Sequence, residues 1–161
     1  KFGESVYPNA NENQVVELLD GTVLMNARNY FYRDFRTEAF SSDGGQRWNR
    51  VNYESDLIES VCQASIFRYS PYKTLNGNVI LFSNPHHREK RIDMTVQVST
   101  DDCKTWAYRK TIYPGPAAYS CLTRLPDGQI GCFYESGQNH PYEKIVLATF
   151  TLDWLTDGAI K

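Results

Sequence analysis

The sequence predicts an all-β protein built from repeated four-stranded units, and three observations carry this prediction. Glycine-marked turns at Gly21, Gly77 and Gly128 lie between strand-like runs and are 56 and 51 residues apart. A second marker begins at Ser41 and again at Ser99, which are 20 and 22 residues after the first two glycines. No segment requires a helix. A repeat of about 50 residues with four strands is typical of a β-propeller blade.

The first two units each divide into four strands. Apolar runs such as 23–25 and 79–82 have no polar face, which suits a sheet stacked between two other sheets. The predicted strands are 14–19, 22–27, 38–41 and 48–53 in the first unit, and 63–69, 78–83, 94–99 and 106–112 in the second.

The third unit is incomplete. It contains a hairpin over 119–135, which turns at Pro126-Asp127-Gly128, and a strand over 145–152, but no fourth strand follows. About three blades cannot close a ring. We therefore expect residues 1–161 to be the C-terminal half of a propeller whose N-terminal half is absent from this chain, cleaved from it or supplied by another chain.

The opening hairpin also predicts a site. Its outer ends carry Tyr119 and Glu135, so the phenol and the carboxylate could face one pocket. Cys121 and Cys132 lie on the two neighbouring strands, which leaves a disulfide possible. The four cysteines fit neither a zinc spacing nor a disulfide framework, and we expect most of them to be free and buried.

Composition narrows the function classes. The 161 residues are 41% hydrophobic and 14% aromatic, which is ample for a core, and the formal charge is -2. Interspersed charges provide no basic stripe for nucleic acid and no polybasic patch for a membrane, and no apolar run approaches a membrane span. A secreted or periplasmic location is favoured, although cysteine usage alone leaves the compartment undecided.

The repeated marker has the form Ser-x-Asp-x-Gly-x-x-Trp. Serine and aspartate can accept hydrogen bonds from turn amides, the glycine can take positive φ, and the tryptophan can cover the turn. The second copy has Cys103 where glycine is expected, so its turn should be more strained or differently shaped. We interpret the marker as a folding device rather than an acidic site.

The chain resembles the C-terminal half of an exo-α-sialidase of the six-bladed, Asp-box type. The two markers, 41–48 and 99–106, correspond to its Asp boxes. Other similar stretches are Asn11-Glu12, Asn26-Ala27-Arg28-Asn29, Cys62-Gln63-Ala64-Ser65, Arg91-Ile92-Asp93-Met94, Ala118-Tyr119-Ser120 and Phe133-Tyr134-Glu135. The similarity runs in order over nearly the whole chain and implies a propeller that releases terminal sialic acid from glycans.

The resemblance implies a role for each matching residue. Tyr119 corresponds to the nucleophile and Glu12 to its base, while Arg28 and Arg91 correspond to the second and third arginines that bind the substrate carboxylate. Glu135 would orient the first arginine, which would lie upstream together with an aspartate acid. A phenol suits this substrate because a carboxylate nucleophile would be repelled by the sugar's own carboxylate. Arg88 is the alternative to Arg91.

The sequence leaves two other functions open. A non-catalytic propeller that binds glycans would need the arginines but not an activated phenol, and a hydrolase of another sugar would not need clustered arginines. The three histidines, His86, His87 and His140, lack a fixed carboxylate partner and do not indicate a metal site. No cofactor is implied. Linkage preference and the fate of the released sugar are not encoded in any motif of this chain.

Overall fold

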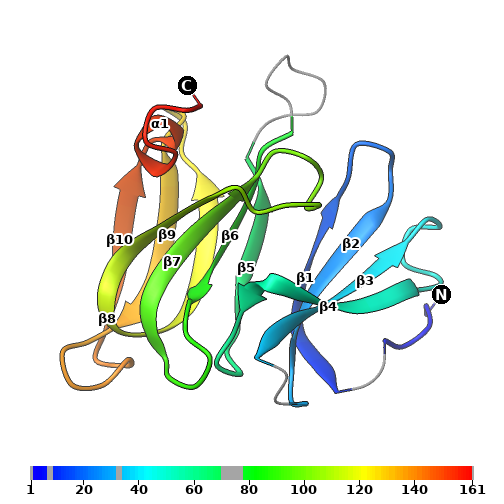
Figure 1. Cartoon of the computed structure of the whole chain (residues 1–161), viewed down its shortest axis with the longest axis horizontal. Helices are drawn as coiled ribbons and strands as arrows, with labels where there is room; N and C mark the ends of the chain where they lie inside the picture. Colours follow the sequence, from blue (N-terminus) through cyan, green and yellow to red (C-terminus); the bar gives the residue numbers. More distant parts are fainter. Residues whose placement is uncertain (1, 7–8, 32–33, 70–77, 161) are drawn as a thin grey trace.

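The computed structural model describes residues 2–6, 9–31, 34–69 and 78–160 and contains two antiparallel sheets (Figure 1). The all-β prediction is confirmed. The first sheet has the order β1-β2-β3-β4, and the second has the order β10-β9-β8-β7-β6-β5. The strands of the first sheet are β1 (Ala10–Glu17), β2 (Val23–Asn29), β3 (Phe35–Ser41) and β4 (Asn49–Ile58). Those of the second are β5 (Ser65–Arg68), β6 (Ile80–Pro85), β7 (Ile92–Ser99), β8 (Tyr108–Arg124), β9 (Ile130–Ser136) and β10 (Lys144–Phe150).

The six-stranded sheet consists of two blades that share β8. This strand has 17 residues and pairs with β7 as far as Pro116, then with β9 from Ala117 onward. The predicted strand 106–112 and the first arm of the predicted hairpin are therefore parts of one continuous strand, which bends as it passes from one blade to the next (Figure 1). The predicted hairpin itself is formed by β8 and β9.

β6 forms the centre of the core because both of its faces are covered. Ile80 and Phe82 pack toward the first sheet with Leu24 and Trp106, whereas Leu81 packs toward the third blade. All six residues of β6 are buried. The prediction of a strand that is apolar on both faces is therefore correct, and burial of this stacked surface holds the blades together.

Both Asp boxes form the same turn. Ser41 Oγ accepts the Gly45 N–H at 2.8 Å, and Ser99 Oγ accepts the Cys103 N–H at 2.9 Å. Cys103 has φ 60°, so a side chain occupies the left-handed conformation that Gly45 adopts at 84°. The second turn is thus strained at a non-glycine residue, as expected, but it has the same hydrogen-bonded shape as the first.

A short helix corrects the expectation that no helix is present. α1 (Leu152–Leu155) follows β10 directly, and the Thr151 side chain caps it by accepting the Trp154 N–H at 3.1 Å. This cap ends the strand that we predicted to extend through Leu152. Part of another predicted feature, the turn at Gly77, lies outside the described residues.

All four cysteines are free, and three of them, Cys62, Cys103 and Cys132, are buried. Cys121 pairs with Phe133 across the hairpin, whereas Cys132 pairs with Leu122. Because neighbouring residues of a strand face opposite sides of the sheet, Cys121 and Cys132 point away from each other, and no disulfide joins them. In the part of the chain that is described, no helix is long and apolar enough to span a membrane.

Candidate active site

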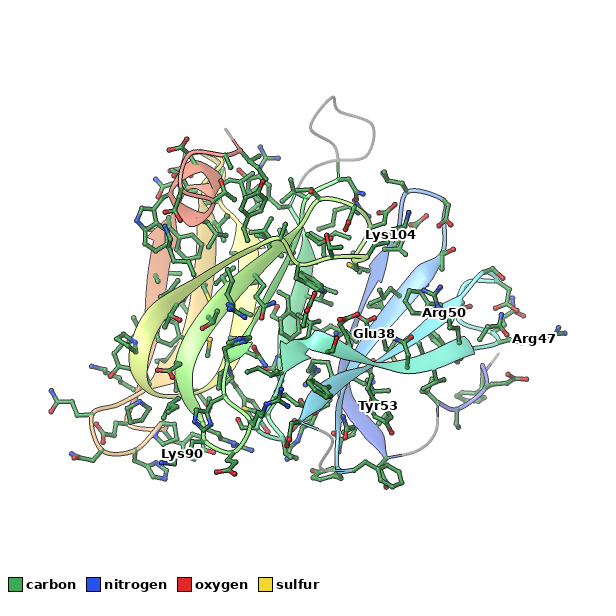
Figure 2. The ribbon with its side chains drawn as sticks, viewed as in Figure 1. Glu38, Arg47, Arg50, Tyr53, Lys90 and Lys104 are labelled. Atoms are coloured by element: carbon green, nitrogen blue, oxygen red, sulfur yellow. The ribbon has the colours of Figure 1, made fainter. Side chains whose placement is uncertain are left out.

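The predicted site residues come from strand ends on one side of the sheets. Glu12 lies near the start of β1 and Arg28 near the end of β2, while Arg91 precedes β7. Antiparallel pairing brings these positions to the same end of the blades. Both Asp-box turns lie at the opposite end: in Figure 2, Lys90, next to Arg91, is far from Arg47 in the first box and from Lys104 in the second.

β-bulges place the two residues that are predicted to react. The pairing of β1 with β2 shifts between Asn11 and Asn13, and Glu12 at this shift has φ 34°. The pairing of β8 with β9 shifts between Ala117 and Ser120, with Tyr119 inside the shift. A bulge redirects a side chain that regular pleating would send elsewhere. Both side chains are thus directed by irregularities in otherwise regular strands.

Glu12, Arg28 and Tyr119 form one hydrogen-bonded cluster. The Tyr119 hydroxyl donates to Glu12 Oε1 at 2.5 Å, and Arg28 Nη1 donates to Glu12 Oε2 at 2.6 Å. Arg28 Nη1 also lies 3.4 Å from Tyr119 Oη. Although burial alone would raise it, hydrogen bonds from Tyr119 and Arg28 hold the pKa of Glu12 below its ordinary value. The carboxylate is therefore a charged hydrogen-bond acceptor for the phenol.

The same hydrogen bond acts on the phenol. Because the Tyr119 hydroxyl donates a hydrogen bond to the Glu12 carboxylate, the pKa of Tyr119 is raised, and partial burial raises it further. The phenol is therefore neutral while it is at rest. Its proton already points at a carboxylate that can receive it, which is the arrangement that general base activation of a hydroxyl requires.

Arg91 lies beside this cluster. Its Nη2 donates to the Val61 carbonyl at 3.0 Å, its Nη1 donates to the Tyr142 hydroxyl, and its guanidinium lies 5.8 Å from the centre of the Tyr119 ring. Arg28 likewise packs on a ring, that of Tyr30, at 4.8 Å. Tyr30 and Tyr142 were not predicted, because neither belongs to a motif that distinguishes it from the other tyrosines of the sequence.

Glu135 reaches Tyr119 through the backbone. Its Oε2 accepts the Tyr119 N–H at 3.1 Å, so the two ends of the hairpin meet as predicted. Arg88, the alternative to Arg91, lies away from the cluster: it is 3.6 Å from Asp34 and packs over the Phe35 ring. The structure brings Glu12, Arg28, Arg91, Tyr119 and Glu135 into one region and leaves Arg88 outside it.

A buried ion pair supports the strand that carries Arg28. Arg36 Nη1 contacts Glu59 Oε2 at 2.6 Å, and both side chains are 1% exposed. Glu59 Oε1 also accepts the Asn29 N–H at 3.0 Å, directly after Arg28. The pair thus joins β3, the end of β2 and the connection after β4. Sequence reasoning missed it because the partners belong to no shared motif.

His86 and His140 each contact another side chain. His86 Nε2 lies 2.9 Å from Arg109 Nη1, and the His140 ring packs against Tyr142. Burial, followed by the charge of Arg109, lowers the pKa of His86 to about 4. Within the described ranges, no three His, Cys, Asp or Glu side chains are grouped as a metal site would need.

Comparison with known proteins defines the class. Residues 3–132 match the BNR repeat-like domain, and the chain belongs to this family. It is 39% identical over 158 residues to the sialidase of Micromonospora viridifaciens, covering 96% of this chain and 24% of that protein. The sialidase of Bacteroides fragilis is 31% identical over 139 residues, covering 82% of this chain and 25% of that protein.

Solved structures show the same fold. The Hadza microbial sialidase Hz136 has a TM-score of 0.74 at 31% identity, over 91% of this chain and 28% of that one. A leech intramolecular trans-sialidase has a TM-score of 0.77 at 23% identity, over 93% of this chain and 24% of that one. The fold is therefore part of a sialidase-type β-propeller, and the chain spans about a quarter of the curated relatives it matches.

Proposed function

We propose that this chain is the C-terminal half of the catalytic propeller of a retaining exo-α-sialidase, which releases terminal sialic acid from glycans through a tyrosyl-enzyme intermediate. The observation that carries the proposal is the 2.5 Å hydrogen bond from Tyr119 to Glu12, with Arg28 bound to the same carboxylate. A module that only binds glycans has no use for a phenol held against a base. The similarity to sialidases supports the substrate class.

In the proposed first step, Tyr119 Oη forms a bond to the anomeric carbon while the bond from that carbon to the aglycone oxygen breaks. The phenol proton passes to Glu12, and the leaving oxygen takes a proton from an acid outside this chain. Water then attacks the anomeric carbon and gives its proton to that acid's conjugate base. The tyrosyl bond breaks, and Tyr119 recovers its proton from Glu12.

Arg28 and Arg91 are proposed to hold the substrate carboxylate. Guanidinium groups suit this task because they bind carboxylates through paired, charge-assisted hydrogen bonds. Arg28 has a mostly buried side chain, 10% exposed, and its partner Glu12 is 32% exposed. Glu135 is proposed to support the first arginine, which would come from upstream, in addition to binding the Tyr119 amide.

The rest of the propeller is proposed to be needed for turnover. Apolar side chains on the outer face of the last blade support this: Phe133, Ile145 and Leu147 are 47%, 73% and 46% exposed. On the other end of the stack, Val15 is 55% exposed. Faces of this kind require cover by neighbouring sheets. An upstream half would cover them and supply the acid and the first arginine.

A fluorescence assay with a 4-methylumbelliferyl sialoside tests the proposal on this chain, the complementing half and their mixture. We expect turnover from the mixture or the complete polypeptide and none from the chain alone, because general acid catalysis contributes about 10²–10⁴-fold and its donor is proposed to lie upstream. Turnover by the purified chain alone would contradict the division into halves. Sialoside binding without turnover by the complete polypeptide would favour the non-catalytic alternative.

A further inference from the structure

Gln63 holds the backbone next to Tyr119 by two hydrogen bonds. Its Nε2 donates to the Ser120 carbonyl at 3.0 Å, and its Oε1 accepts the Ser120 N–H at 2.9 Å. The two residues are 57 positions apart, and Gln63 comes from the connection between β4 and β5. One side-chain amide therefore satisfies both backbone groups of the residue that follows Tyr119.

The two hydrogen bonds from Gln63 take the place of those that a neighbouring strand would make to this edge of β8. From Ala117 onward, β8 pairs with β9 on one side, and alternate residues turn their backbone groups toward the other edge. Ser120 is one of them, and Leu122 is the next: its N–H donates to Ser65 Oγ at 3.1 Å. Gln63 and Ser65 are spaced by two residues, as are their targets, so two side chains satisfy the free edge of β8 in register.

The two hydrogen bonds from Gln63 to Ser120, which we call the Gln63 clamp, lie where β8 is least constrained by its own sheet. The register of β8 against β9 shifts between Ala117 and Ser120, which leaves Tyr119 within a bulge. Glu135 holds one side of the bulge by accepting the Tyr119 N–H at 3.1 Å. On the other edge, Gln63 fixes Ser120. Two side chains from different blades thus set the backbone from which the phenol projects.

We propose that Gln63 is a positioning residue for Tyr119, an inference that rests on the proposed function. Loss of the clamp leaves a polar backbone pair unsatisfied and lets the bulge relax, which moves Tyr119 Oη away from Glu12. A misplacement of about 1 Å can cost roughly 100-fold in rate. Substrate binding depends on the two arginines instead, so the clamp affects the chemical step more than affinity.

A second hydrogen bond in the same connection involves Arg91, and its effect on ligand binding must be distinguished from the effect of Gln63 on Tyr119. Val61, two residues before Gln63, accepts a hydrogen bond from Arg91 at 3.0 Å. A change that simply loosened the whole connection would therefore weaken ligand binding as well as turnover. A change that only released Ser120 would lower kcat and leave the dissociation constant of a sialic acid analogue unchanged.

The test compares Gln63→Leu with Gln97→Leu in the complete polypeptide. Gln97 is the control because its side-chain amide also donates to a backbone carbonyl of a distant residue, that of Asp56, at 3.2 Å. At 1% exposed it is more buried than the half-buried Gln63, so a general cost of replacing a buried glutamine would appear in this control as well. We expect Gln63→Leu to lower kcat by about 10- to 100-fold. Its dissociation constant for a non-hydrolysable sialic acid analogue should stay within about twofold of the parent's, and Gln97→Leu should change neither quantity by more than that.

An unchanged kcat in Gln63→Leu, or a parallel loss of turnover and affinity, would overturn the inference. If Gln63→Leu does not fold, Gln63→Glu decides, because the carboxylate keeps the acceptor for the Ser120 N–H, loses the donor to the Ser120 carbonyl and adds a negative charge. We expect a smaller fall in kcat there, and an unchanged kcat overturns the inference. An inactive parent protein contradicts the proposed function and this inference together, whereas an active parent with a Gln63→Leu variant of unchanged kcat contradicts this inference alone.

Discussion

Tyr119 Oη lies 2.5 Å from Glu12 Oε1, although the two residues are 107 positions apart. Each projects from a bulge in a different blade, so the contact exists only when the blades are stacked in the native order. The contact raises the pKa of the phenol and, against the effect of burial and together with Arg28, lowers that of the carboxylate. The proposed chemistry therefore depends directly on how the first and third blades are placed.

The first prediction concerns acidification. The proposed base is the Glu12 carboxylate, whose pKa lies below its ordinary value of 4.5, so its contribution is present above that lowered pKa and is lost as pH falls through it. Arg28→Met removes the ion pair that favours the charged form, so the acid limb of kcat/KM, which reports the pKa values of the free enzyme, should move to higher pH. A pH profile of kcat/KM measures this, and an unmoved limb contradicts Glu12 as the base.

The second prediction concerns the buried ion pair. Glu59→Gln leaves the Arg36 charge uncompensated where both side chains are 1% exposed, so we expect a loss of about 3–5 kcal/mol in the free energy of unfolding. The control is Asp34→Asn, which removes an exposed pair at 3.6 Å to Arg88 and should cost about 0–1 kcal/mol. Denaturant unfolding of the complete polypeptide measures both. Equal losses would argue against a structural role for the buried pair.

The third prediction concerns Tyr142, whose hydroxyl accepts a hydrogen bond from Arg91 Nη1. The hydroxyl competes with a substrate carboxylate for this nitrogen. Tyr142→Phe should therefore tighten binding of a sialic acid analogue by roughly fivefold, or about 1 kcal/mol. Tyr30→Phe is the control, because Tyr30 contacts Arg28 through its ring face and should leave affinity unchanged. Weaker binding by Tyr142→Phe in calorimetry would show instead that the hydroxyl contacts the ligand.

The fourth prediction concerns Glu38, which Figure 2 shows on β3. Burial, and secondarily the charge of Glu54, raises its pKa to about 7 from 4.5. Because the folded-state pKa is the higher one, the associated stability is fully present below pH 4.5 and is lost as pH rises through 7, by about 3 kcal/mol. Glu38→Gln should remove this loss.

Unfolding free energies between pH 4.5 and 8 measure this effect. Glu54→Gln is the control: its side chain lines the same groove as Glu38, and it should leave most of the pH dependence in place. A pH dependence that persists unchanged in Glu38→Gln would show that another group is responsible.

The sequence predicted those features that repeat or that belong to a motif. The Asp boxes and glycine turns predicted the blades, and the stretches around Glu12, Arg28, Arg91 and Tyr119 predicted residues that the structure brings together. It could not predict that β8 continues through Pro114-Gly115-Pro116, because prolines and a glycine ordinarily end a strand.

Contacts between distant residues that belong to no motif were beyond the sequence. The Gln63 clamp on Ser120 and the Arg36–Glu59 pair each join residues that no periodic pattern relates. Each of these polar side chains alone is as consistent with a solvated surface as with a buried partner. Only the stacking of the blades decides between the two.

Mass spectrometry of the complete polypeptide after reaction with a fluorinated sialyl donor tests whether Tyr119 is the nucleophile. We expect a covalent sialyl adduct on the peptide that contains Tyr119. The Tyr119→Phe variant should give no adduct and should still bind sialic acid, since the arginines remain. An adduct on another residue, or one that persists in Tyr119→Phe, would show that Tyr119 is not the nucleophile.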